Sequence, residues 1–177
     1  HAPMPAPELY EGADKFTLNS LKKMIFAHDL KGNIYNPRNK EIKCIVEGKA
    51  RGNLIGGNLS ILCSSLGTEN EIDTRNKILF IEEIGEEPYK VDRMLLQLVQ
   101  AGKINDCAGI IFGYFSSCEP SNPNQSLTIS EVIKELIKPC GKPIIAGVAC
   151  GHSLPSLTLP MGVEVVIDSK NKNIKII

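Results

Sequence analysis

Residues 77–115 read KILFIEEIGEEPYKVDRMLLQLVQAGKINDCAGIIFGYF, in which two apolar runs of strand length flank one amphipathic helix. The runs KILFI (77–81) and AGIIFGYF (108–115) are typical of strands that are covered on both faces. One face of the intervening segment is apolar at helical spacing, through Val91, Met94, Leu95, Leu98 and Val99. A helix between two buried strands predicts an α/β fold around a parallel sheet.

The segments on either side extend this pattern. Proline-rich residues 1–12 predict extended backbone, and the Gly, Asn and Pro content of residues 28–40 predicts a loop. Helices are predicted at 17–27 with Thr17 as N-cap, at 59–66, and at 128–138 with Thr128 and Glu131 as a capping box. Strands are predicted at 41–52 and 144–148, and a β-hairpin at 163–177. The sequence therefore predicts a central parallel sheet with additional antiparallel strands.

Composition limits the classes of partner. The 177 residues carry no net formal charge, 42% are hydrophobic and 23% are charged, which is ordinary for a globular domain. We expect no nucleic-acid partner because no basic stripe stands out, and no membrane partner because no apolar run has the length of a span. Six cysteines without any CxxC pair predict no structural metal site and a reduced, cytoplasmic protein.

A histidine ends the apolar run in PIIAGVACGHSLP, residues 143–155. The ends of parallel strands are where α/β folds usually place their chemistry, although His152 could also be a loop histidine without a role. Glu82 directly continues the strand at 77–81, so a parallel sheet would bring its carboxylate to the same edge as His152. A carboxylate beside a histidine fixes the imidazole tautomer, and such a pair can activate a hydroxyl nucleophile.

The sequence offers no convincing nucleophile for that pair. It has no Gly-x-Ser-x-Gly elbow. Ser153 adjoins the histidine, Ser60 lies in a predicted helix, and Cys150 is a chemically sensible rival at an unsuitable spacing. The stretch after residue 81 holds four carboxylates, Glu82, Glu83, Glu86 and Glu87. At least two of them are expected in a solvated acidic loop, with Glu86 or Glu87 at the start of the next helix.

Several segments resemble, in fixed order, the LD-carboxypeptidase family of serine peptidases, which includes the microcin-immunity peptidases. They are GGNLSILCSSLGT (56–68), ILFIEEIGEEPYKVDRMLLQLVQAGK (78–103), GIIFGYFSSC (109–118) and GVACGHSLPSLTLPMG (147–162). The N-terminal HAPMPAPEL is similar to a family stretch that begins His-Gly-Pro-Met, with Ala2 in place of the glycine. The resemblance covers essentially the whole chain.

The resemblance implies a domain organisation and a set of site residues. Residues 1–40 would be an interdomain linker with one helix, and residues 41–177 a swivelling three-layer β/β/α C-terminal domain. The N-terminal domain that supplies the nucleophilic serine would lie outside this chain. Glu82 and His152 would be the other two members of the triad. Gly57 and Asn58 would shape the substrate pocket, although a tight Gly56-Gly57 turn with Asn58 as a helix cap explains them equally well.

The resemblance also implies an activity. The family's cytoplasmic bacterial enzymes release the terminal D-alanine of muropeptide tetrapeptides by cutting an L-to-D amide bond, without metal or cofactor. They tend to be homodimers. Two alternatives remain open: a microcin-immunity peptidase that cleaves aminoacyl-nucleotide conjugates, or a binding module without enzymatic activity. If a partner domain normally covers the site, this chain alone should expose apolar surface at Pro88, Tyr89 and residues 154–159.

Overall fold

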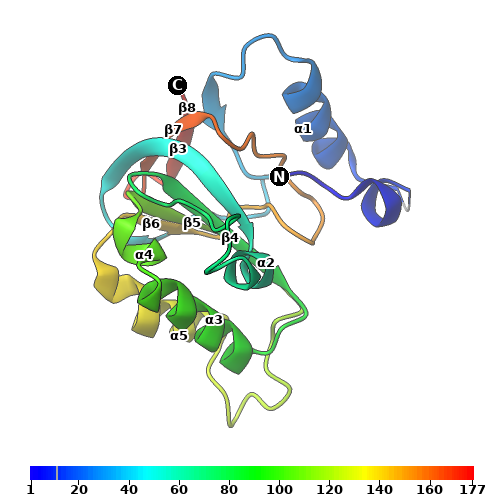
Figure 1. Cartoon of the computed structure of the whole chain (residues 1–177). Helices are drawn as coiled ribbons and strands as arrows, with labels where there is room; N and C mark the ends of the chain where they lie inside the picture. The colour runs from blue at the N-terminus through cyan, green and yellow to red at the C-terminus, as the bar shows by residue number, and fades with distance from the viewer. Residues whose placement is uncertain (11) are drawn as a thin grey trace.

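An eight-stranded mixed sheet organises the chain (Figure 1). The computed structural model describes residues 1–10 and 12–177, without the side chains of residues 7 and 8. The strand order is β1-β8-β7-β3-β4-β5-β6-β2. The strands are β1 (Gly32–Ile34), β2 (Lys43–Val46), β3 (Lys49–Asn58), β4 (Ile78–Ile84), β5 (Gly109–Ser116), β6 (Ile144–Ala146), β7 (Glu164–Asp168) and β8 (Asn173–Ile176).

Four parallel strands form the centre of the sheet, as the sequence predicts. β4 pairs in parallel with β3 and β5, and β5 with β6. The long strand β3 belongs to two parts of the sheet: its residues 49–53 pair antiparallel with β7, and its residues 54–58 pair with β4. The predicted terminal hairpin is present as β7 and β8, and β2 adds an antiparallel edge beside β6.

The helices are α1 (Lys15–Phe26), α2 (Leu59–Ser64), α3 (Pro88–Gln100), α4 (Lys103–Asp106) and α5 (Ile129–Val132), with short turns η1 (Pro5–Leu9), η2 (Ile133–Ile137) and η3 (Lys138–Cys140). Figure 1 shows α3, α4 and α5 gathered on one side of the sheet, with α1 at a distance from them. The predicted capping box is confirmed, because Thr128 and Glu131 bond reciprocally at the start of α5. No helix among the described residues is long and apolar enough to cross a membrane.

Alternate residues of β4 enter two hydrophobic clusters. Leu79 and Ile81 pack with α2, α3 and α4, whereas Ile78 and Phe80 pack with the β7–β8 hairpin. All four side chains are fully buried. Because burying such a side chain contributes about 1.5–3 kcal/mol, this strand is a main source of stability. The central strands thus separate a helical layer from a layer of antiparallel strands.

The N-terminal forty residues differ from expectation. Residues 1–12 were expected to be extended, but Pro5–Leu9 form a π-helical turn, since proline is tolerated in the first turn of a helix; residue 11 lies outside the described residues. Residues 28–40 contain β1, which completes the sheet by pairing with β8. The predicted N-cap Thr17 is wrong, because α1 begins earlier: its N-cap is Asp14, whose carboxylate accepts from the backbone N–H groups of Phe16 and Thr17.

Two further expectations about residues 41–58 are wrong. The predicted strand 41–52 is two strands, β2 and β3, separated at Glu47 and Gly48. The hydroxyl of Ser169 donates to the carbonyls of Val46 and Gly48 and stabilises this break. Gly56 and Gly57 lie in strand β3 and form no tight turn. Glycine is needed at position 56 because a Cβ atom there would be 1.9 Å from the carbonyl oxygen of Phe80.

Candidate active site

Glu82 and His152 lie together at the carboxyl edge of the parallel strands. β4 continues past the predicted end at residue 81, so Glu82 is part of the strand and fully buried. His152 lies in the loop after β6, partly exposed, with its Nδ1 atom 2.8 Å from Oε2 of Glu82. The predicted proximity of the two strand ends is therefore present, although β5 lies between β4 and β6 in the sheet.

The environment of Glu82 determines the protonation pattern of this pair. Burial raises the pKa of the Glu82 carboxyl, and the hydrogen bond to His152 opposes this effect. When the carboxylate is ionised, Nδ1–H of His152 donates to it and the second ring nitrogen, Nε2, becomes the acceptor. The pair therefore presents a basic nitrogen on the side of the imidazole that faces away from Glu82.

The loop that carries His152 is held by the N-terminal segment. In α1, the hydroxyl oxygen of Thr17 accepts from the backbone N–H of Ser156, and that of Ser20 from the N–H of Thr158. The side chain of Asn36 bonds the backbone at Gly147 and at Ala149. Residues 1–40 thus pack against the loop at residues 147–159.

The nucleophile candidates within the chain have other environments. Cys150 is fully buried, and burial raises the pKa of its thiol to about 12. The hydroxyl of Ser153 lies 2.5 Å from that of Ser116 on β5. Ser60 donates its hydroxyl to Oδ1 of Asn58. Low thiolate content makes a buried cysteine a poor nucleophile, so Cys150 does not suit that role.

Asn58 ends β3 opposite Glu82 and begins α2. Its Oδ1 accepts from the N–H of Ile61, which confirms the predicted helix cap. Its Nδ2 donates to Oε1 of Glu83 at 2.8 Å. Asn58 therefore lies beside the Glu82–His152 pair. Gly57 is close too, since it pairs with Ile81, the residue before Glu82 on β4. A role of either residue in binding substrate remains a prediction.

Glu83 does not belong to the solvated acidic loop. Its side chain is 1% exposed. The carboxylate accepts from Nδ2 of Asn58 and from the backbone N–H groups of Ser60 and Ile84, each at 2.8 Å. Sequence spacing could not reveal this arrangement, because the donors come from a helix start 23 residues earlier.

The outer carboxylates behave as expected. Glu87 is the N-cap position of α3, and its carboxylate accepts from Ser121. These bonds lower the pKa of the Glu87 carboxyl. Glu86 forms an ion pair with Lys90 one turn later.

Only part of the apolar surface that was expected to be exposed is in fact exposed. Tyr89 and Leu154 are exposed, at 54% and 41%. Pro88 is buried at the start of α3, and Leu157 and Leu159 are buried in the cluster that includes the β7–β8 hairpin. Two more large apolar side chains near the strand ends are exposed, those of Ile61 and Ile84.

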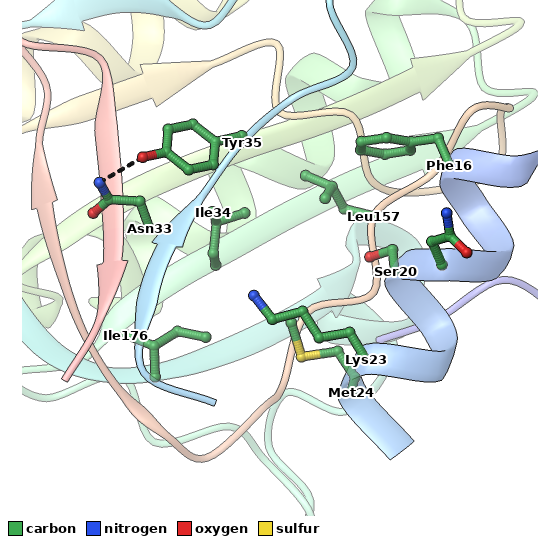
Figure 2. A pocket seen from close by; sticks show the side chains of 10 residues that line it. Phe16, Ser20, Lys23, Met24, Asn33, Ile34, Tyr35, Leu157 and Ile176 are labelled. Carbon is green, nitrogen blue, oxygen red and sulfur yellow. Dashed lines mark hydrogen bonds between the residues drawn. The ribbon is translucent and has the colours of Figure 1, made fainter. Parts of the chain in front are cut away.

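A separate cavity of about 260 Å³ lies between α1 and the edge of the sheet (Figure 2). Its lining is mostly apolar and includes Met24, Ile34, Leu157 and Ile176, with the amine of Lys23 at its rim. Neither Glu82 nor His152 lines it. Among residues 1–10 and 12–177, no three His, Cys, Asp or Glu side chains form a group that could hold a metal ion.

Known proteins share both the sequence and this fold. A probable murein peptide carboxypeptidase of Bacillus subtilis is 47% identical over 128 residues, which are 72% of this chain and 40% of that protein. The microcin C7 self-immunity protein MccF of Escherichia coli is 34% identical over 134 residues, 73% of this chain and 37% of that protein. This chain therefore spans about 40% of the length of these curated relatives.

Solved structures agree with the same assignment. The muramoyltetrapeptide carboxypeptidase of Oxalobacter formigenes superposes with a TM-score of 0.82 at 28% identity, over 99% of this chain and 58% of that one. MccF in an inactive mutant form gives a TM-score of 0.85 at 26% identity, over 99% and 59%. The family model for the LD-carboxypeptidase C-terminal domain matches residues 51–167. The chain belongs to the LD-carboxypeptidase family, and its residues 51–167 match the family's C-terminal domain.

Proposed function

We propose that this chain is the C-terminal part of a serine-type LD-carboxypeptidase, a hydrolase that releases terminal D-alanine from muropeptide tetrapeptides. Glu82 and His152 would supply two members of the triad, and the serine would come from a domain outside this chain. The observation that carries the proposal is the 2.8 Å contact between Nδ1 of His152 and Oε2 of Glu82 at the edge of the parallel strands.

The geometry suits a hydrolytic mechanism. Nε2 of His152 would take the proton of the serine hydroxyl as its oxygen attacks the carbonyl carbon of the L-to-D amide bond. The resulting imidazolium is stabilised by the Glu82 carboxylate and would protonate the leaving amine of D-alanine. Water, deprotonated by the same imidazole, would then hydrolyse the acyl-enzyme. No metal or cofactor takes part in this scheme.

The domain division follows from the same proposal. Residues 41–177 would form the catalytic C-terminal domain, and residues 1–40 the segment that links it to the nucleophile domain. The hydrogen bonds from α1 and Asn36 support a linker that also braces the His152 loop. The exposed side chains of Ile61, Ile84, Tyr89 and Leu154 are apolar surface that such a domain could cover.

A second substrate class has specific support. MccF is a relative of this chain, and solved structures of MccF hold aspartyl sulfamoyl adenosine and glutamyl sulfamoyl guanosine. The same histidine–glutamate pair could hydrolyse such aminoacyl-nucleotide conjugates. The higher identity to the murein peptide carboxypeptidase, 47% against 34%, favours the muropeptide. We place the enzyme in the bacterial cytoplasm as a homodimer, from the family resemblance.

Parallel assays on two substrates test this proposal. The polypeptide that joins this chain to its nucleophile domain should release D-alanine from a muropeptide tetrapeptide at least tenfold faster than it cleaves aspartyl sulfamoyl adenosine. The reverse order would assign it to the immunity branch. Absence of both reactions in a folded protein would favour a binding module.

A further inference from the structure

Glu82 has a second carboxylate oxygen that His152 does not use. Within the described part of the chain, Oε1 of Glu82 accepts no hydrogen bond, although the side chain is fully buried. The imidazole of His1, which can carry a positive charge, has its Nε2 atom 3.8 Å from Oε1. Burying a carboxylate oxygen without a hydrogen-bond donor is energetically unfavourable. A neighbouring cation would offset this cost by stabilising the ionised carboxylate.

His1 is held in place by contacts that do not involve Glu82. Its backbone nitrogen donates to the carbonyl of Leu159 at 2.8 Å, and its own carbonyl accepts from the N–H of Leu159 at 2.8 Å. Its ring packs at a tilt against Phe80, with 5.2 Å between the ring centroids. Phe80 precedes Glu82 by two residues on β4, so both side chains lie on the same face of that strand. The imidazole is therefore directed at Glu82 by packing.

Leu159 also connects His1 to the other member of the pair. It ends the same loop that carries His152, and Figure 1 shows the N-terminus beside this loop. A segment more than 150 residues away in sequence is thus hydrogen-bonded to the His152 loop through its backbone, and its imidazole lies close to Glu82. This arrangement gives the two oxygens of one carboxylate two different imidazoles.

We propose that His1 is a positioning residue: its imidazolium pairs with Oε1 of Glu82 and holds the carboxylate ionised, with Oε2 directed at His152. This inference rests on the proposed role of the Glu82–His152 pair in catalysis. The other polar groups that face Glu82 cannot supply the same charge. They are the His152 imidazole on the opposite oxygen, the Asn58 amide, the Glu83 carboxylate, the Cys150 thiol and the amino group of His1, which is directed at Leu159.

Three substitutions separate charge from packing. His1→Phe keeps a ring against Phe80 and removes the charge. His1→Arg keeps a positive charge, and His1→Gln supplies a second charge-free side chain should the phenylalanine variant fold poorly. His28→Phe is the control, because His28 is exposed in the loop after α1. All four variants keep the backbone hydrogen bonds between residue 1 and Leu159.

The first measurement does not depend on activity. Carbon-13 NMR of the Glu82 carboxyl in the 177-residue chain should show that its titration midpoint rises by about one pH unit in H1F and H1Q, because a neighbouring cation favours the carboxylate. The midpoint should stay near the wild-type value in H1R and H28F. Equal midpoints in all variants would overturn the proposal.

The second measurement concerns catalysis in the protein that includes the nucleophile domain. For H1F, kcat for D-alanine release should fall about tenfold with little change in KM, and the acid limb of its pH profile should move to higher pH. H1R should restore both. A loss in H1F that H1R does not restore would mean that His1 acts by packing alone. If the wild-type enzyme released no D-alanine, the proposed function would fail, while the NMR titration would still decide the role of His1.

Discussion

Gly151 lies directly against Glu82: a Cβ atom at Gly151 would be 2.7 Å from Oε2 of Glu82 and 3.2 Å from its Cβ. The backbone of Gly151 also has a φ of +131°, which residues with a side chain rarely adopt. Oε2 is the oxygen that contacts His152. A glycine therefore precedes the histidine because the carboxylate occupies the space that a side chain would need.

Replacing Gly151 by alanine should displace the Glu82 carboxylate. We expect G151A to lower the free energy of unfolding by about 2–3 kcal/mol, from strain and overpacking together, and to lower kcat of the complete enzyme more than tenfold. Urea unfolding and D-alanine release measure the two effects. Gly162→Ala is the matched control, because Gly162 also has a positive φ, +86°, but nothing lies within 4 Å of its Cβ position. Equal losses in both variants would contradict this steric explanation.

Glu83→Gln tests the buried network at the start of α2. A carboxylate can accept from Asn58, Ser60 and Ile84 together, whereas the amide nitrogen of glutamine can accept from none of them. Loss of a buried acceptor predicts a decrease of about 2–3 kcal/mol in the free energy of unfolding, measured in urea. The exposed Glu119→Gln should change it by less than about 0.5 kcal/mol. An E83Q variant as stable as the wild type would show that the network is dispensable.

Cys150→Ala should leave catalysis nearly intact. The thiol is fully buried, and its raised pKa of about 12 keeps it protonated at neutral pH. We expect kcat to remain within about threefold of wild type, with some loss of stability from the small cavity. Iodoacetamide should not label Cys150 in the folded protein at pH 8. Loss of activity by several orders of magnitude in a folded C150A variant would make this cysteine the nucleophile.

Glu82→Gln should change how stability depends on pH. Burial raises the pKa of the folded Glu82 carboxyl above its ordinary value of 4.5, so the folded state binds its proton more tightly than the unfolded state does. This group therefore stabilises the fold below pH 4.5, and that contribution is lost as pH rises through the folded pKa. As pH rises from 4.5 through the folded pKa of Glu82, the free energy of unfolding of E82Q minus that of wild type should increase and then level off. Urea unfolding of both proteins at a series of pH values measures this difference. A difference that does not change with pH would contradict the raised pKa.

The central layers could be predicted from the sequence because their signals are local. The apolar run at 77–81, the periodic helix at 91–101 and the Thr128–Glu131 capping box each specify an element within a few residues. The Glu82–His152 contact followed from parallel topology, since β4 and β6 are parallel strands on either side of β5 and their carboxyl ends lie at one edge of the sheet.

The errors occurred where distant segments determine the structure. β1 exists because β8, about 140 residues later, supplies its hydrogen bonds, and a three-residue strand has no period of its own. Glu83 is buried because Asn58 and the start of α2 supply donors to its carboxylate. His1 approaches Glu82 through Leu159, from the opposite end of the chain. Such contacts leave no trace in local composition.

The rate of D-alanine release by the polypeptide that includes the nucleophile domain, compared between wild type and His152→Ala, tests the central claim most directly. If Nε2 of His152 is the general base held by Glu82, H152A should fold normally and lose about 10⁴- to 10⁶-fold in kcat, while His28→Ala should behave as wild type. A folded H152A enzyme that releases D-alanine at a rate near wild type would contradict the account.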